Sequence, residues 1–145
     1  MKQLNYIKLE FPARSVNEGF ARTAAAAFAA QLDPTLEELG DVKTAVSEAV
    51  TNAIVHAYPD TVGTVTMRLR ILEGNVLELT VRDRGVGIPD VKKAMEPMFS
   101  TGGEERSGMG FTIMDSFMDG LRVRSVPGRG TTVTMTKRVA VKRPR

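Results

Sequence analysis

The sequence has 145 residues, of which 42% are hydrophobic and 26% charged, and a formal net charge of +3. These values fit one globular domain with a single core and argue against a disordered chain. The absence of cysteine excludes disulfide bonds and thiolate metal sites, and the single histidine, His56, excludes a multi-histidine metal site. No apolar run approaches the ~20 residues that span a bilayer, and the N-terminal segment lacks the apolar stretch of a signal peptide. We therefore expect a cytoplasmic protein with a single domain over residues 1–145.

The first part of the chain predicts one strand and two long helices. Its patterns place the strand at 4–11 and the helices at 15–32 and 35–57. Ser15 with Glu18, and Thr35 with Glu38, have the spacing of a capping box, in which a side chain at each position satisfies a backbone amide at the start of a helix. Each predicted helix therefore has a sequence signal for its beginning.

The second part predicts a sheet interrupted by a glycine-rich segment. Alternation of apolar residues predicts strands at 64–73, 76–83, 121–126 and 131–137, and helical spacing predicts helices at 91–95 and 109–118. Asp83 falls on the apolar, core-facing side of its strand, where a carboxylate needs a partner. Because the strands segregate from the helices, we expect an α+β fold, a two-layer sandwich in which a mixed, mostly antiparallel sheet packs on helices.

Basic residues crowd the C-terminal end of the chain, at Lys137, Arg138, Lys142, Arg143 and Arg145. No aromatic residue lies among them to stack on bases, so we expect no direct contact with nucleic acid. We interpret residues 137–145 as a solvated tail that frays from the domain.

Glu48 and Asn52 stand one turn apart on the second predicted helix. An asparagine carbonyl is a suitable ligand for Mg²⁺, and a glutamate can act as a base. The small side chains of Ala45 and Ala49 leave room for a bulky group at that edge of the helix. Taken alone, the pair is also what a solvated helix face presents.

Two further motifs surround the end of the strand that carries Asp83. Gly85 and Gly87 allow tight turns and the close approach of a flat ligand, and the Asp83 carboxylate is suited to accept a hydrogen bond from the exocyclic amine of adenine. Thr131 follows the turn at 128–130 and offers a hydroxyl to a nucleotide edge. The alternatives are a glycine-rich turn capped by Asp83 and an ordinary hairpin.

Gly108 and Gly110 open the predicted helix at 109–118, and Arg106 precedes them. The free amides at a helix start favour a phosphate group, and an arginine can bind phosphate through two nitrogen atoms. The alternative is a helix that begins with glycines and binds nothing.

The order of these motifs is more specific than any one of them. A Glu-x-x-x-Asn helix, an Asp-x-Gly-x-Gly loop, a Gly-x-Gly helix start and a Gly-x-Gly-Thr hairpin together resemble the Bergerat-type (GHKL) superfamily of histidine kinases, gyrase-type ATPases and Hsp90 chaperones. The motifs extend from about Leu36 to Val133. The segments SEAVTNAI and ERSGMGFTIM are similar, more closely, to the anti-sigma factor serine kinases of sporulating bacteria.

This resemblance implies ATP and Mg²⁺ as cofactors and assigns roles to the residues of the motifs. It implies that Glu48 is the general base and Asn52 the Mg²⁺ ligand. It implies that the adenine is recognised by Asp83, Gly85, Gly87 and Thr131. It implies that the phosphates are held by Arg106, Gly108 and Gly110, beneath a lid over residues 97–107.

The family also implies partners and an activity. Its members bind and inhibit a sporulation sigma factor, phosphorylate a serine of an anti-anti-sigma protein, and are typically homodimers. Phe20, Arg22 and Phe28 of the first helix form a candidate partner surface, although phenylalanines at helical spacing are more often part of a core.

Three other functions compete with the serine kinase. A histidine kinase needs a phosphoacceptor histidine upstream, and none precedes Asp41; His56 is better explained as a core or capping residue. A clamp-type ATPase needs a transducer domain that the sequence lacks. An anti-sigma module that uses ATP only to hold its shape has no need of a base such as Glu48.

Overall fold

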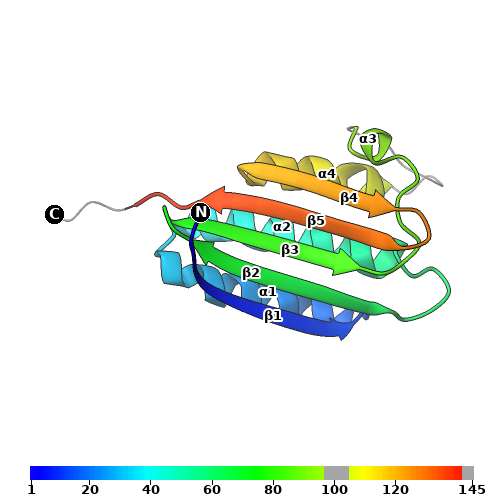
Figure 1. Ribbon diagram of the computed structural model, residues 1–145, viewed down its shortest axis with the longest axis horizontal. Helices are drawn as coiled ribbons and strands as arrows, with labels where there is room; N and C mark the ends of the chain where they lie inside the picture. Colours follow the sequence, from blue (N-terminus) through cyan, green and yellow to red (C-terminus); the bar gives the residue numbers. More distant parts are fainter. Residues whose placement is uncertain (97–104, 142–145) are drawn as a thin grey trace.

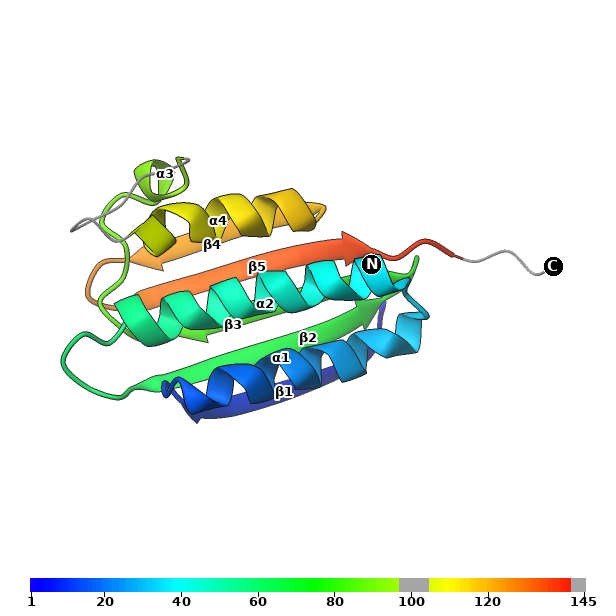
Figure 2. The same cartoon turned by 180° about the vertical axis from the view of Figure 1, so that it is seen from behind.

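The computed structural model describes residues 1–96 and 105–141. Over these residues the chain forms a five-stranded sheet with helices on one face, so the expected α+β, two-layer architecture is confirmed (Figures 1 and 2). The strands are β1 (Gln3–Pro12), β2 (Thr64–Leu72), β3 (Val76–Asp83), β4 (Gly120–Val126) and β5 (Gly130–Arg138). The helices are α1 (Val16–Ala29), the short 3₁₀ turn η1 (Ala30–Leu32), α2 (Leu36–His56), α3 (Val91–Ala94) and α4 (Glu105–Phe117).

The strands lie in the order β1-β2-β3-β5-β4, and every neighbouring pair in this part of the chain is antiparallel. The sheet is therefore more regular than the mixed sheet that we predicted. The register pairs Asp83 at the end of β3 with Thr131 at the start of β5. Two residues from separate sequence motifs thus meet at one end of the sheet.

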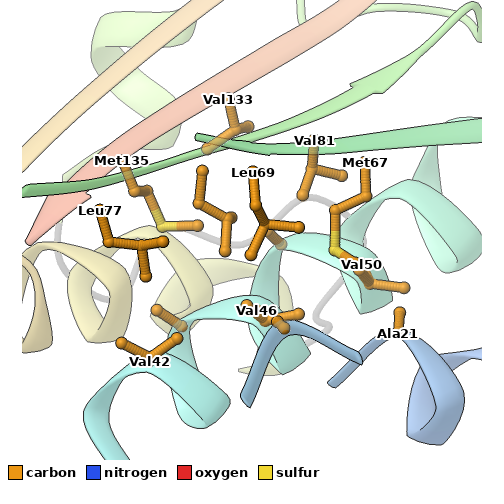
Figure 3. Close-up of a cluster of buried hydrophobic side chains, with 14 of the residues drawn as sticks. Ala21, Val42, Val46, Val50, Met67, Leu69, Leu77, Val81, Val133 and Met135 are labelled. Carbon is orange, nitrogen blue, oxygen red and sulfur yellow. The ribbon is translucent and has the colours of Figure 1, made fainter. Parts of the chain in front are cut away.

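The core lies between the sheet and the three long helices, α1, α2 and α4. Alternate residues of the strands point toward the helices, and Figure 3 shows these side chains meeting Val42, Val46 and Val50 of α2. The fully buried residues include Met67, Leu69, Leu77, Leu79 and Met135. The described residues contain no helix that combines the length and apolarity needed to cross a membrane.

The two predicted capping boxes have different outcomes. At α2, Glu38 N donates to Thr35 Oγ1 over 3.1 Å and Thr35 N donates to the Glu38 carboxylate over 2.8 Å, so that prediction is confirmed. At α1 the prediction is wrong, because Ser15 has helical backbone angles and its side chain caps no amide. The Glu18 carboxylate accepts a hydrogen bond from Ser47 Oγ of α2 instead, and thereby joins the two helices.

The expectation of a frayed basic tail is wrong for its first residues. Lys137 and Arg138 belong to β5, and Val139 is buried. Lys137 Nζ donates to Asp41 Oδ2 over 3.2 Å and to the carbonyl of Phe117 over 2.9 Å. The charge of Lys137 therefore serves the fold. Lys142, Arg143 and Arg145 lie outside the described residues.

The phenylalanines of α1 divide between core and surface. Phe28 is buried, whereas 64% of Phe20 is exposed to solvent. Phe28 is therefore removed from the candidate partner surface, and Phe20 stays in it.

Candidate active site

A pocket of about 450 Å³ opens at the end of the sheet where β3 ends and β5 begins. Its walls come from the C-terminal half of α2, β3, the segment 86–90, α3, α4 and β5. Most of the lining is apolar and includes Ala53, Val81, Ile88, Phe111 and Val133. A pocket of this size, with a small number of polar groups among apolar walls, is typical of small-molecule sites.

Asp83 is the charged residue of the pocket that is most buried, with 8% of its surface exposed. Its Oδ1 accepts hydrogen bonds from Gly85 N over 3.0 Å and from Thr131 N over 3.2 Å. Burial raises the pKa of the Asp83 carboxyl above its ordinary value, and these two backbone bonds oppose that shift. Both of these bonds use Oδ1.

Two positions of the loop after Asp83 are packed so closely that neither can carry a side chain. A Cβ at Gly85 would lie 2.0 Å from the carbonyl oxygen of Ala57 at the end of α2. Gly87 has a φ of +76°, and a Cβ there would lie 2.5 Å from the carbonyl oxygen of Val126. Both predicted glycines are therefore needed to hold this loop between α2 and the β4–β5 turn.

Asn52 lines the pocket from α2, and Glu48 lies one turn earlier on the same helix. Glu48 is partly buried and is not among the described lining residues. A Cβ at Gly110 of α4 would lie 2.9 Å from Asn52 Nδ2, so a larger residue there would displace the amide. Gly110 thus lets α4 pack directly against Asn52.

Two comparisons with known proteins identify the family. Residues 11–137 match the model of the histidine kinase-like ATPase domain. The anti-sigma F factor of Caldanaerobacter subterraneus subsp. tengcongensis is 58% identical over 138 residues, which cover 94% of this chain and 96% of that protein. The anti-sigma F factor of Geobacillus stearothermophilus is 55% identical over 134 residues, which cover 92% of each chain. The chain belongs to the anti-sigma F factor family.

The solved structures agree on the fold. The RsbU and RsbW domains of Rv1364c from Mycobacterium tuberculosis superpose with a TM-score of 0.68 at 18% identity; the match covers 94% of this chain and 32% of that longer one. The histidine kinase domain of a blue-light activated kinase from Erythrobacter litoralis EL346 gives a TM-score of 0.59 at 25% identity, covering 84% of this chain and 61% of that one. An anti-sigma F factor chain therefore shares its architecture with histidine kinase domains.

In this member of the family, α4 begins earlier than we predicted. It starts at Glu105 rather than near Met109, so Gly108 lies within its first turn. Only the first four amides of a helix lack partners inside it, and Gly110 lies beyond them. Gly110 thus has a packing role against Asn52, whereas the amide of Gly108 stays a candidate for binding phosphate. The side chain of Arg106 and most of the predicted lid, residues 97–104, lie outside the described part of the chain.

Sequence reasoning missed three residues of the site. His56, which we interpreted as a core or capping residue, lines the pocket. The Tyr58 hydroxyl donates to the carbonyl of Thr64 and accepts from Arg84 N, both over 2.7 Å, and so fixes the loop after Asp83. Ser125 of β4 accepts a hydrogen bond from Ile88 N over 2.7 Å. Like Asp83, Ser125 is a polar residue on the apolar, core-facing side of its strand. The alternation pattern that singled out Asp83 could therefore have singled out Ser125 as well.

Proposed function

We propose that this chain is a Mg-ATP-dependent protein serine kinase that binds and inhibits a sporulation sigma factor and phosphorylates an anti-anti-sigma protein on serine. The single observation that carries the proposal is Asp83, a buried carboxylate at the floor of an apolar pocket in a histidine kinase-like ATPase domain. The names of the relatives supply the sigma factor as a partner.

Adenine fits the base end of this pocket. The second oxygen of Asp83 accepts a hydrogen bond from the exocyclic amine, and Thr131 lies opposite Asp83 on the paired strand. Apolar side chains such as Val133 and Ile88 supply flat walls for the ring. A charge-assisted hydrogen bond of this kind is among the stronger ones in proteins.

The metal site that we propose consists of Asn52 and the nucleotide itself. Over the described residues no group of three or more histidine, cysteine or acidic side chains is placed to hold a metal ion. Mg²⁺ suits this arrangement, because it commonly binds through one or two protein oxygens together with substrate phosphates. Asn52 faces the pocket and is held against Gly110, as such a ligand requires. When bound, the ion would neutralise the charge that develops on the phosphate oxygens.

Glu48 takes the part of the general base in this proposal. It accepts the proton of the partner's serine hydroxyl while the serine oxygen bonds to the γ-phosphorus, the bond to the bridging oxygen breaks and ADP leaves. Glu48 lies one turn before Asn52 on α2, farther from the end of α2 that packs against the loop after Asp83. This position supports a role beside the phosphates. Gly108 at the start of α4, with Arg106, would hold the phosphates.

The partner surface that we propose includes the exposed side of α1. Phe20 is 64% exposed and Val16 is 81% exposed, and the two lie about one turn apart on one face of the helix. Arg22, two residues after Phe20, lies on a different side of α1. Exposed apolar residues that share one face of a helix are typical of protein contacts. We place the protein in the cytoplasm as a homodimer that contacts its sigma factor and anti-anti-sigma partners and neither membrane nor nucleic acid.

The proposal is tested by phosphoryl transfer under single turnover. Protein saturated with ATP labelled at the γ-phosphate is mixed with a candidate anti-anti-sigma protein, and labelled serine is identified. Glu48→Gln should slow the transfer by roughly 10²–10⁴-fold, because glutamine cannot accept the proton. Its ATP affinity should stay within a few-fold of wild type, whereas Asn52→Ala should weaken Mg-ATP binding itself.

The same experiment separates the kinase from the alternative. If Glu48→Gln transfers phosphate at the wild-type rate, the base is another residue. If no partner serine is labelled while ATP and sigma factor still bind, the chain is an anti-sigma module that uses ATP structurally.

A further inference from the structure

Ser125 of β4 connects three parts of the pocket through one hydroxyl group. It accepts a hydrogen bond from Ile88 N over 2.7 Å and lies 2.8 Å from Thr131 Oγ1 and 3.1 Å from the carbonyl oxygen of Gly130. Ile88 and Thr131 both line the pocket. Ser125 itself is only partly buried and is not among the described lining residues, so it acts on a ligand through its neighbours.

The donors and acceptors of this cluster limit what Thr131 can do. A serine hydroxyl carries one proton and accepts through two lone pairs. The amide proton of Ile88 occupies one lone pair, so the proton of Ser125 goes either to Thr131 Oγ1 or to the carbonyl of Gly130. Thr131 is the nearer of the two acceptors.

When Ser125 donates to Thr131, the proton of Thr131 is released from Ser125 and can point into the pocket. The hydrogen bonds then run in one direction, from Ile88 N–H to Ser125, from Ser125 to Thr131, and from Thr131 to a ligand acceptor. Hydrogen bonds that follow one another in this way polarise and strengthen each other in a site of low dielectric constant.

We propose that Ser125 is a positioning residue that makes Thr131 a hydrogen-bond donor to an acceptor nitrogen on the ring edge of the bound base. This inference rests on the proposed binding of ATP. Asp83 accepts from the exocyclic amine of adenine, and Thr131 lies directly opposite Asp83 in the register, so Thr131 meets the ring nitrogen next to that amine, directly or through one water molecule. The pocket thus presents an acceptor and a donor side by side, which matches the donor and acceptor of adenine.

Tyr58 provides a matched comparison on the other side of the same loop. Its hydroxyl binds Arg84 N and the carbonyl of Thr64, as Ser125 binds Ile88 N, and neither of these two bonds involves Thr131. Loss of the Tyr58 hydroxyl should therefore loosen the loop and leave the hydroxyl of Thr131 directed as before.

The test measures two nucleotides by calorimetry, ATP and 1-deaza-ATP, which keeps the amine but lacks the ring acceptor. Wild type should bind ATP roughly three- to tenfold more tightly than 1-deaza-ATP, the range for one neutral hydrogen bond. In Ser125→Ala this ratio should fall to less than half of the wild-type ratio, because Thr131 loses the group that directs and polarises its proton. Ser125→Thr, which keeps the hydroxyl, should restore the ratio.

Tyr58→Phe is the control and should weaken both nucleotides equally, so that the ratio stays at the wild-type value. Thr131→Val should bring the ratio close to one, and adding Ser125→Ala to it should change the ratio no further. Thermal unfolding without nucleotide checks that each variant is folded.

An unchanged ratio in Ser125→Ala would overturn the proposal, and so would an equal fall in Ser125→Ala and Tyr58→Phe. If Ser125→Ala does not fold, the proposal is overturned when Thr131→Val shows the wild-type ratio of ATP to 1-deaza-ATP affinity. Failure of wild type to bind ATP at all is a different result, because it contradicts the proposed function rather than the role of Ser125.

Discussion

The two ends of the sheet each place a charged residue on the side that faces the helices. Asp83 ends β3 at one end, and Lys137 lies near the end of β5 at the other, where Figure 1 shows α2 beginning. Lys137 has partners from two helices, Asp41 of α2 and the last carbonyl of α4, and no pocket is described beside it. Asp83 receives two backbone amides on a single oxygen and borders the pocket.

Under the proposed function, this difference separates a charge that serves the fold from a charge that serves a ligand. A buried charge is tolerated when its partners replace water, as at Lys137. A buried charge whose hydrogen bonds do not replace all of its lost hydration lowers stability, and we propose that at Asp83 the nucleotide supplies the missing bond. Substitutions at the two ends should therefore act on different measured quantities.

The largest effect on stability is expected at Lys137. Lys137→Met should lower the free energy of unfolding by about 2–3 kcal/mol, because Asp41 and the carbonyl of Phe117 lose a charged donor. For a domain of this size the loss corresponds to roughly 5–10 °C in melting temperature. Arg138→Met, which removes the neighbouring exposed charge, should change the melting temperature little. Equal effects of the two substitutions in thermal unfolding would break the comparison.

The largest effect on binding is expected at Asp83. Asp83→Ala should raise the dissociation constant for ATP about ten- to hundredfold, the value of a charge-assisted hydrogen bond of roughly 1.5–3 kcal/mol. The control, Asp60→Ala, removes an exposed carboxylate just after α2 and should leave the affinity unchanged. Calorimetry that gives Asp83→Ala an affinity within a factor of two of wild type would remove Asp83 from the base site.

A smaller effect is expected at Glu38, at the same end of the sheet as Lys137. Its carboxylate accepts from Thr35 N and from Ala140 N over 3.0 Å, and these bonds, that of Thr35 first, hold the pKa of Glu38 below its ordinary value of 4.5. A carboxyl group whose pKa is lowered in the folded protein adds to the free energy of unfolding when the pH is above its ordinary pKa. This contribution is lost as the pH falls through the lower pKa of the folded state. At pH 7, Glu38→Gln should cost about 0.5–1 kcal/mol.

Urea unfolding of wild type and Glu38→Gln between pH 7 and pH 3 checks this prediction. The two stability curves should converge as the pH falls below about 4.5. A gap that stays constant over the whole range would show that the charge of Glu38 contributes nothing.

The smallest effect, with the opposite sign, is expected for Asp83→Asn in the absence of nucleotide. Burial raises the pKa of Asp83, so its stability contribution is complete below the ordinary value of 3.8 and is lost as the pH rises through the higher, folded value. Asparagine keeps an oxygen for Gly85 N and Thr131 N but cannot ionise. Urea unfolding should therefore find the variant more stable than wild type at pH 7, with a difference that shrinks as the pH falls. A variant that is less stable at pH 7 would contradict this account of Asp83.

The sequence predicted the parts of the molecule in which a local pattern decides the structure. Period-two alternation located every strand and put Asp83 on the inner face, because each side chain of a strand points to the face opposite its neighbour's. The capping box of Thr35 and Glu38 is equally local, since both partners lie within one helical turn.

The predictions were wrong where a residue that is distant in the sequence binds the side chain in question. The pattern of Ser15 and Glu18 was the same as that of Thr35 and Glu38, but Ser47 of another helix binds the Glu18 carboxylate. Lys137 resembled the rest of a basic tail because Asp41, its partner, is far away in the sequence. Tyr58 showed no signal, because the groups that it joins meet only when the sheet has formed.

Part of the pocket wall consists of backbone, and this restricts which larger ligands the pocket can be engineered to accept. At Gly85 and Gly87 themselves there is no side chain to shorten, since each glycine already packs against a carbonyl oxygen. An engineered enzyme that accepts an ATP analogue with an enlarged base must therefore gain its space elsewhere. Val133 and Phe111 are side chains of the pocket that can be made smaller. Under the proposed function, such an orthogonal pair of enzyme and analogue would report the targets of this chain among those of all other kinases in the cell.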